Sequence, residues 1–249
     1  MKNWWIIGLT ALLATASSAS AALFYDDLED QSLENWTVAD NPISAPDGFW
    51  EVEQEPGNTD IEVINDPTGS NHGKIIRLYD NDSNGGYQNP RLQAHIGFNW
   101  MPAIVSYDVY FPTELGGARN RIYTLDDGFV SEIRWETDGK IKVRVAPDVL
   151  TTDVGAYSAN TWYNVWQKFS ADSYNLVITQ EGVGTIVDWT DTTLSNQPTF
   201  EYIRFMGITD TSTGVYYLDN IVIPEPTTAA VVCIGLAGLC LFRGKRTED

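Results

Sequence analysis

Three polar side chains close together in the chain could act on a charged sugar. Side chains along a β-strand alternate between its two faces, so Arg91, Gln93 and His95 would share one face. Arginine neutralises a carboxylate and histidine moves protons near neutral pH, which are two tasks of a lyase that cleaves an acidic polysaccharide. The alternative is that His95 is a half-buried strand residue. The other histidine, His72, lies in an Asn-His-Gly segment that is typical of a loop.

No pair of carboxylates has the spacing that a glycoside hydrolase needs. A retaining enzyme of this kind holds its two carboxyl groups about 5 Å apart. Glu132 and Glu136 would share a strand face but lie roughly 13 Å apart at about 3.3 Å per residue. The alternating acids Glu51, Glu53 and Glu55 are typical of a solvent-facing strand. The sequence also lacks zinc-ligand spacing and a phosphate-binding loop.

Aromatic side chains are the other candidates for sugar binding, because their faces stack on the apolar faces of pyranose rings. Seven of the nine tryptophans lie between residues 22 and 226. Trp100, beside a Met-Pro pair, and Trp189, before a Thr-Asp-Thr-Thr turn, are our candidates for glycan stacking. Trp162 and Trp166 would share one strand face, and we predict that they belong to the core.

The elements that must position these side chains are β-strands. Short alternating or β-branched runs recur without a helical period, separated by Gly, Pro, Asn and Asp. The clearest strands are expected at 104–111, 129–136, 140–145, 162–169, 174–179, 202–206 and 215–223. The Asp138-Gly139 pair predicts a two-residue hairpin turn. No linker interrupts the pattern, so we predict one all-β domain over residues 22–223, an antiparallel β-sandwich of the jelly-roll type.

This region resembles concanavalin A-like lectin and glucanase folds and the jelly rolls of carbohydrate-binding modules. The similar segments are an aromatic and acidic opening, a middle hairpin with the next strand, and a closing strand, at 24–36, 138–141, 160–163 and 216–221. The resemblance implies that the first and last strands are neighbours and that a structural Ca²⁺ lies between them. Glu29 and Asp219 fall on its ligand positions, with Asp27 as a third ligand. The alternative is that Asp27 and Glu29 face solvent and Asp219 makes a turn or capping hydrogen bond.

The Gln93-Ala-His95 segment also resembles the Gln-Ile-His segment of alginate lyases that have this fold. The companion Arg-Thr-Glu-Leu-Arg and Tyr-Phe-Lys-x-Gly-x-Tyr segments of those enzymes are absent from this sequence. The segment 131–134, Ser-Glu-Ile-Arg, is a poor substitute for the first of them and occurs in the wrong order.

The N-terminus has the pattern of a secretory signal peptide over residues 1–21. Lys2 precedes a mostly apolar stretch over residues 4–16, and small residues precede a cleavage position before Ala22. The apolar stretch is short for a membrane span, and no basic group follows to stop transfer. We therefore predict export and removal of residues 1–21 by signal peptidase, with an uncleaved anchor as the alternative.

The C-terminus consists of a Pro-Glu-Pro motif, an uncharged apolar stretch over residues 227–242 and a basic segment over residues 243–246. As a transmembrane helix, the apolar stretch would be about 24 Å long, and basic side chains at its end could reach the membrane surface. Positive charge beyond the span predicts a cytoplasmic end, which places the domain outside.

This arrangement over residues 224–249 resembles the PEP-CTERM sorting signal that exosortases recognise. Pro224, Glu225 and Pro226 fall on its motif, and Arg243 and Arg246 fall in its basic cluster. The resemblance implies export through the inner membrane of a Gram-negative bacterium, transient anchoring by the C-terminal helix, and removal of the tail by a membrane protease. The domain would then reach the cell surface or an extracellular polysaccharide matrix. The alternative is an ordinary tail anchor.

The domain between the two end segments is more acidic than the whole chain. The chain has 15 Lys and Arg against 34 Asp and Glu, a net charge of −19. Four of these bases and two of the acids lie outside residues 22–226, so residues 22–226 carry 11 bases, 32 acids and a net charge of −21. A nucleic-acid phosphate backbone requires clustered bases, and the sequence contains no such cluster. Both cysteines, Cys233 and Cys240, lie in the apolar tail.

Together these features predict a secreted, exosortase-sorted surface or matrix protein whose jelly-roll domain binds a glycan without catalysis. Two alternatives stay open: a polysaccharide-active enzyme, either a lyase or a glycoside hydrolase, and a purely structural surface protein. Aromatic residues on a concave face without paired acids would favour binding, and clustered Arg, Gln, His and Tyr would favour a lyase. The expected partners are signal peptidase, an exosortase-type protease and extracellular polysaccharide, and Ca²⁺ is the expected cofactor.

Overall fold

The computed structural model describes most of the predicted domain. The described residues are 22–26, 37–38, 50–53, 59–70, 72–80, 90–98, 103–113, 118–124, 128–146, 151–170, 172–192, 200–206 and 214–224. Within these ranges, no helix is long and apolar enough to span a membrane. The predicted signal peptide (1–21) and the sorting tail after Pro224 lie outside them, so both stay predictions.

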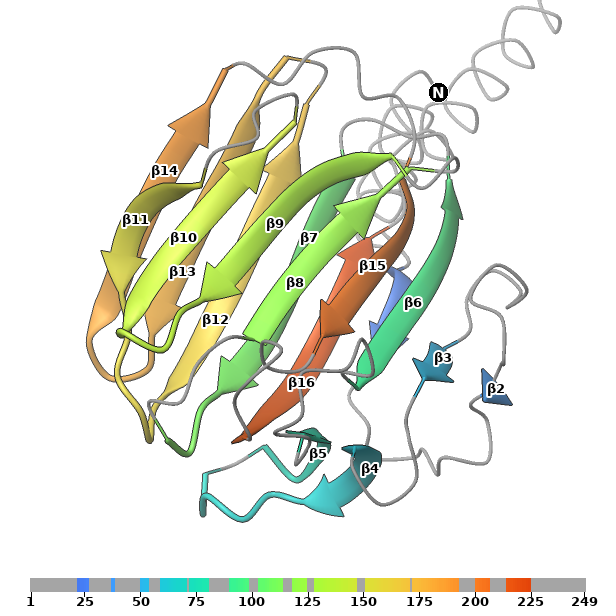
Figure 1. Cartoon of the computed structure of the whole chain (residues 1–249), viewed down its shortest axis with the longest axis vertical. Helices are drawn as coiled ribbons and strands as arrows, with labels where there is room; N and C mark the ends of the chain where they lie inside the picture. Colours follow the sequence, from blue (N-terminus) through green and yellow to red (C-terminus); the bar gives the residue numbers. More distant parts are fainter. Residues whose placement is uncertain are drawn as a thin grey trace, which may run out of the picture.

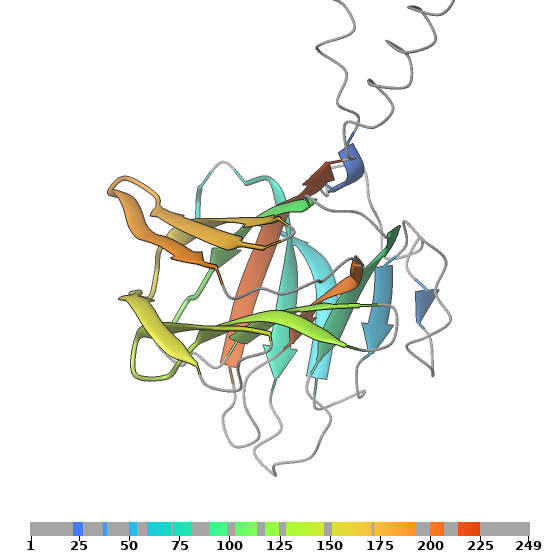
Figure 2. The ribbon, with the colours of Figure 1, turned by 90° about the horizontal axis from the view of Figure 1, so that it is seen from above.

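Two eight-stranded sheets pack face to face as a β-sandwich (Figures 1 and 2). In spatial order, sheet A contains β14 (Gly184–Asp191), β13 (Tyr174–Gln180), β12 (Trp162–Phe169), β7 (Ala103–Tyr110), β16 (Gly214–Pro224), β5 (Lys74–Asp80) and β4 (Thr59–Asn65), with β1 (Ala22–Asp26) also paired to β16. Sheet B contains β11 (Thr152–Ala156), β10 (Lys140–Val145), β9 (Phe129–Trp135), β8 (Ala118–Tyr123), β15 (Phe200–Met206), β6 (Arg91–Phe98), β3 (Trp50–Glu53) and β2 (Thr37–Val38). All pairs are antiparallel except β2 with β3, so the predicted all-β antiparallel sandwich is confirmed.

The first and last described strands are neighbours, as the jelly-roll resemblance implied. Strand β1 pairs antiparallel with β16, and Ala22 lies opposite Pro224. Residues 22 and 224 therefore lie side by side at the C-terminal end of β16. The two predicted end segments would both begin at this point.

The outward position of Trp162 and Trp166 contradicts their predicted place in the core. On β12, residues 163, 165, 167 and 169 face the other sheet, so the two tryptophans lie on the outer face of sheet A. Trp162 is nevertheless buried, because the ring of His72 stacks on it with centroids 3.8 Å apart. A two-residue period shows which side chains share a face, but it does not show which face meets the core.

The hairpin between β9 and β10 has a three-residue turn rather than the predicted two-residue turn. The backbone N–H of Glu136 donates to the Lys140 oxygen at 2.9 Å, which leaves residues 137–139 as the loop. Gly139 takes the left-handed conformation that closes it, with φ of 77°.

A chain of hydrogen bonds crosses the core between the two sheets. Tyr174 Oη donates to Gln167 Oε1 at 2.9 Å, and Gln167 Nε2 donates to Asn120 Oδ1 at 3.1 Å. Asn120 Nδ2 then donates to the backbone oxygen of Arg204 at 3.4 Å. Buried polar groups without partners are costly, so this chain holds β8 and β15 in one position against β12 and β13. It therefore fixes the backbone from which Arg204 projects.

We expect Tyr174→Phe to lower the free energy of unfolding by about 1–3 kcal/mol, because it leaves the buried Gln167 oxygen without its donor. Chemical denaturation measures this difference. Tyr110→Phe is the control, since the exposed Tyr110 hydroxyl makes one long contact of 3.4 Å to Asn160. Equal stability of the two variants would show that the buried chain does not hold the sheets together.

Candidate functional site

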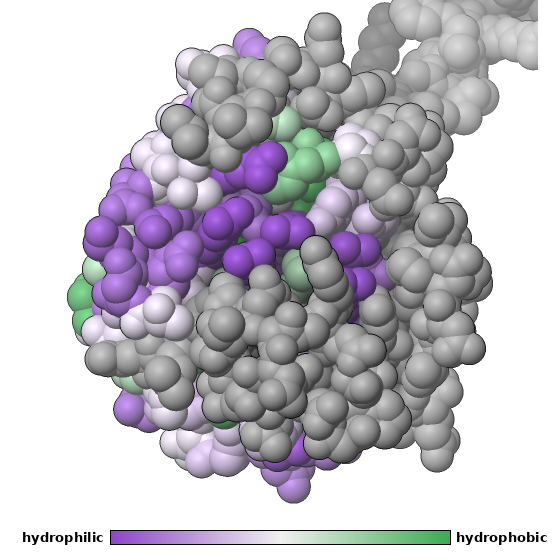
Figure 3. Space-filling view, in the orientation of Figure 1, coloured by the Kyte–Doolittle hydropathy of each residue, from purple (hydrophilic) through white to green (hydrophobic). Residues whose placement is uncertain are grey.

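The bases of the domain gather on one side of the sandwich. Eight of the 11 bases between residues 22 and 226 lie on the outer face of sheet B: Arg91, Arg119, Arg121, Arg134, Lys140, Lys142, Arg144 and Arg204. Directly paired residues of neighbouring strands point to the same face, so the register brings these side chains together. Figure 3 shows hydrophilic side chains in a band across the middle of this face, over strands of sheet B. The other three bases are on sheet A.

One cross-strand row runs through this face, and we call it the arginine row. Glu132 on β9 lies opposite Arg121 on β8, Arg121 lies opposite Arg204 on β15, and Arg204 lies opposite Gln93 on β6. Like charges directly opposite each other destabilise a pair of strands. Arg121 and Arg204 therefore each need a compensating group.

Arg121 is compensated by the buried carboxylate of Glu132. Arg121 Nε donates to Glu132 Oε1 at 2.7 Å, and Arg134 Nε donates to Oε2 at 2.7 Å. The Glu132 side chain is 0% exposed, against 23% and 24% for the two arginines. Burial opposes its ionisation, but the hydrogen bonds from both arginines and their charges outweigh burial and hold the pKa of Glu132 below its ordinary value.

Arg204 is held by neutral groups instead of an acid. Its Nε donates to Gln93 Oε1, and its Nη2 donates to the Tyr202 hydroxyl at 3.4 Å. Its guanidinium carbon lies 4.9 Å from the Tyr123 ring centre and 5.1 Å from that of Tyr202, within cation–π range. These two rings stack on each other at 4.8 Å.

The contacts of Arg204 leave part of its hydrogen-bonding capacity for a ligand. A guanidinium has five N–H donors, and the contacts to Gln93 and Tyr202 use two of them. Among the described residues, no carboxylate pairs with Arg204, and Gln93 Nε2 is buried without a partner. An arginine with free paired donors binds a carboxylate through two parallel hydrogen bonds. The arginine row can therefore receive an acidic ligand at Arg204.

The predicted lyase residues lie on the strand next to Arg204. Arg91, Gln93 and His95 all belong to β6; Arg91 and Gln93 point to the outer face of sheet B, and His95 lies opposite Tyr202 in the strand register. Gln93 is 1% exposed and orients Arg204. The His95 side chain lies outside the described part of the structure. The fold thus brings Arg, Gln and Tyr side chains together on one face, and it adds Arg121 and Glu132 to the predicted set.

The predicted stacking residues lie away from the arginine row or outside the described residues. Trp189 is on β14 of sheet A, where it is half-buried against the core and its ring meets Tyr174 edge to face at 6.0 Å. Trp100 is outside the described ranges. The stacked aromatic pair beside Arg204 consists of Tyr123 and Tyr202 instead.

Asp219, the described member of the predicted Ca²⁺ set, lies in a separate cluster on the outer face of sheet A. Its Oδ2 is 2.6 Å from His72 Nδ1, and Asp108 Oδ2 is 3.9 Å from the same nitrogen. Burial disfavours the charged form of His72, but the hydrogen bond that it donates to Asp219 and the charges of Asp219 and Asp108 raise its pKa above the ordinary value. Asp27 and Glu29 lie outside the described residues, so the three-residue Ca²⁺ set stays a prediction.

The sequence did not mark Arg121, Arg204, Tyr123 or Tyr202 as site residues. A local signal does exist, since Arg and Tyr occupy alternate positions on β8 and β15. The two strands come together only through pairing across more than 75 residues, which no local pattern reports. The same limit applies to His72, whose partners lie 36 and 147 residues further along the chain.

Comparison with known proteins supports the fold. No protein-family model and no curated protein matches the sequence. A sialidase structure matches 84% of this chain with a TM-score of 0.58 and 13% identity, and this chain spans 19% of that one. Peanut lectin matches with a TM-score of 0.48 and 10% identity over 77% of this chain and 95% of its own. The exoplasmic/lumenal domain of VIP36, in a form bound to Ca²⁺ and Man3GlcNAc, matches with a TM-score of 0.49 and 10% identity. The match covers 71% of this chain and 83% of that domain.

These structures include both enzymes and lectins, and at such low identity the sialidase match shows a common β-sandwich fold alone. The function must therefore be argued from the residues of the site.

We expect Glu132→Gln to destabilise the fold by about 3 kcal/mol at pH 7, because it leaves Arg121 and Arg134 without their buried counter-charge. The lowered pKa of Glu132 means that its contribution is present above the unfolded pKa and is lost as the pH falls through the folded pKa. The difference in the free energy of unfolding between wild type and variant should therefore become smaller in acid. Urea denaturation at several pH values measures it.

Glu136→Gln is the matched control, since Glu136 is 26% exposed and lies 3.7 Å from Lys142. Glu136→Gln should lower the free energy of unfolding by less than about 1 kcal/mol. A Glu132→Gln protein as stable as this control would contradict a structural role for the buried carboxylate.

Proposed function

We propose that this chain is a secreted surface protein whose jelly-roll domain binds an acidic polysaccharide across the outer face of sheet B. The main support is the environment of Arg204. Gln93 and the stacked rings of Tyr123 and Tyr202 orient this side chain, and it has no acidic partner among the described residues. A sugar carboxylate would take the free donors of Arg204, and the half-buried ring of Tyr123, stacked on the buried Tyr202, offers an apolar face beside it.

The distribution of charge supports a ligand that is an extended polyanion. The domain carries a net charge of −21 over residues 22–226, so most of its surface repels polyanions. Eight of its 11 bases lie on one sheet face, which is the region where an acidic chain meets attraction. An extended polymer that crosses the strands of sheet B would pass Arg144, Arg121 and Arg204 in turn.

A polysaccharide lyase is the second candidate, and a specific observation favours it. Arg, Gln and Tyr side chains meet on one face of sheet B, with His95 opposite Tyr202 in the strand register. In β-elimination, a base removes the proton beside the uronate carboxylate, a carbon–carbon double bond forms as the glycosidic C–O bond breaks, and the departing oxygen takes up a proton from an acid or from water. Arginine beside that carboxylate stabilises the charge that develops on it. Tyr202 or His95 would be the base.

Secretion and sorting complete the proposal, and they rest on the two end segments of the sequence. The signal-peptide pattern at 1–21 supports export, and the Pro-Glu-Pro motif with its apolar and basic segments supports exosortase sorting. The neighbouring positions of Ala22 and Pro224 are compatible with both. Strands β1 and β16 belong to sheet A, so an attachment after Pro224 would begin on the sheet that does not carry the arginine row.

We expect the purified protein to bind alginate or polygalacturonate, and Arg204→Ala to weaken that binding at least tenfold, or about 1.4 kcal/mol. Binding should also weaken as salt is added, because the attraction is between charges at a surface. Titration calorimetry at two salt concentrations measures both effects. Arg77→Ala is the matched control, since Arg77 is paired with Asp60 on sheet A.

Three results would contradict this proposal: equal weakening by the two substitutions, equally tight binding of a neutral glucan, or tighter binding of single-stranded DNA. The same acidic polysaccharides also test the second candidate. Ultraviolet absorbance from unsaturated uronate ends, present with wild type and lost in Arg204→Ala, would show that the domain is a lyase and not only a binding module.

In cells with an exosortase, we expect mass spectrometry to find protein that lacks residues 1–21 and the tail from Thr227 onward. Replacing Pro224-Glu225-Pro226 by three alanines should leave the tail in place, because the protease would no longer recognise its motif. An intact tail on wild-type protein from such cells would contradict the sorting proposal.

A further inference from the structure

Two carboxylates lie directly opposite each other on the outer face of sheet A. Asp108 on β7 pairs with Asp219 on β16 in the antiparallel register. This arrangement destabilises the strand pair unless a cation lies between the two groups. Their exposed fractions of 15% and 3% reduce the screening that water could provide.

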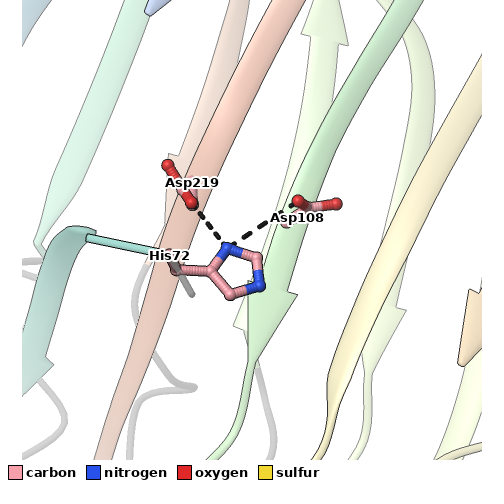
Figure 4. A group of neighbouring side chains, drawn as sticks. All are labelled: His72, Asp108 and Asp219. Carbon is pink, nitrogen blue, oxygen red and sulfur yellow. Dashed lines mark hydrogen bonds and ion pairs between the residues drawn. The ribbon is translucent and has the colours of Figure 1, made fainter. Parts of the chain in front are cut away.

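Two described residues contact both carboxylates: Asn220, whose Nδ2 donates to Asp108 Oδ2 at 2.7 Å and to Asp219 Oδ2 at 3.2 Å, and His72, from the loop between β4 and β5 (Figure 4). Its Nδ1 is 2.6 Å from Asp219 Oδ2 and 3.9 Å from Asp108 Oδ2, and the three atoms all lie within 4.8 Å of one another. Ligands at about 2.0–2.2 Å around a tetrahedral Zn²⁺ are separated by roughly 3.3 Å. The two nitrogen–oxygen distances bracket that value, so a small shift of the imidazole would equalise them.

The second oxygen of each carboxylate is fixed by a neighbouring amide. Asn164 Nδ2 donates to Asp108 Oδ1 at 2.7 Å, and the backbone N–H of Asn220 donates to Asp219 Oδ1 at 2.7 Å. Both Oδ2 atoms are thereby turned toward His72. Such outer hydrogen bonds orient the carboxylates of metal sites in proteins.

An irregularity in β16 occurs at this same position. The pairing with β7 shifts register after Asp219, and Asn220 has a φ of 49°, in the left-handed region. Its side-chain nitrogen consequently reaches Asp108 Oδ2 at 2.7 Å. Bulges of this kind commonly re-aim side chains next to functional sites.

The loop that carries His72 is also held in place. The imidazole stacks on the indole of Trp162 at 3.8 Å and 18° between planes, and Trp162 Nε1 donates to Thr68 Oγ1 at 3.2 Å. A backbone hydrogen bond of 2.7 Å from Asp66 to Gly73 closes the loop. The Nδ1 atom of His72 therefore faces the carboxylates before any ion arrives, which lowers the ordering cost of binding.

We propose that His72, Asp108 and Asp219 form a binding site for a divalent transition-metal cation of the Zn²⁺ class. One imidazole and two carboxylates suit such a cation, with its fourth position open, whereas Ca²⁺ takes six to eight oxygens. The site differs in ligands and in metal from the Ca²⁺ set predicted at Asp27, Glu29 and Asp219. It lies on the opposite face of the sandwich from the arginine row and does not depend on glycan binding.

The test is a titration of the chelator-treated full chain with Zn²⁺, Mn²⁺ or Ca²⁺ and no glycan present. We expect one equivalent of Zn²⁺ to bind saturably and to raise the melting temperature. Asp108→Asn should weaken Zn²⁺ binding at least tenfold while it leaves the His72–Asp219 pair in place. Asp153→Asn is the matched control, since Asp153 is 52% exposed on β11 of sheet B, and its Zn²⁺ affinity should equal that of wild type.

His72→Gln is a second test, because it removes the imidazole ligand and should abolish the preference for Zn²⁺ over Ca²⁺. Absence of saturable Zn²⁺ binding to the wild type would overturn the proposal, even if a variant failed to fold. Equal affinity of Asp108→Asn and Asp153→Asn, or tighter binding of Ca²⁺ than of Zn²⁺, would overturn it as well. Without saturable Zn²⁺ binding, the cluster is a histidine–aspartate ion pair that only holds the loop.

Discussion

On each outer face of the sandwich, like charges lie directly opposite each other on neighbouring strands. Arg121 faces Arg204 on sheet B, and Asp108 faces Asp219 on sheet A. Such pairs are unfavourable by themselves, so the surrounding residues are arranged to offset them. The core chain from Tyr174 through Gln167 and Asn120 holds β8 and β15 in the register that creates the arginine pair.

The two pairs are offset in different ways, and the difference determines what each face can bind. Arg121 shares the buried carboxylate of Glu132 with Arg134, whereas Arg204 has an amide and two aromatic rings as neighbours. The charge of Arg204 is therefore positioned but not neutralised by a described acid, which suits a sugar carboxylate. On sheet A, the His72 imidazole and the Asn220 side-chain amide contact both aspartates, and a divalent cation could lie between the same two carboxylates.

The sequence predicted the features that depend on local pattern. Alternating runs located most strands, the jelly-roll resemblance predicted that β1 and β16 are neighbours, and the period of two placed Gln93 on one face with Arg91. It could not predict contacts between strands that are distant in the chain, such as Arg121 with Arg204. Trp162 was misplaced because the period does not identify the inward face, and His72 looked like an ordinary loop residue because its partners come from β7 and β16.

The central claim is that an acidic sugar binds at Arg204, with its charge met by a guanidinium that Gln93 and two tyrosines hold in place. The most direct test is NMR of the arginine Nε–Hε groups and tyrosine rings during titration with a short oligouronate. The account predicts saturable shifts of Arg204, Tyr123 and Tyr202, with Arg77 on sheet A unchanged. Shifts that are centred on Arg77, or weak unsaturable shifts of every arginine, would contradict it.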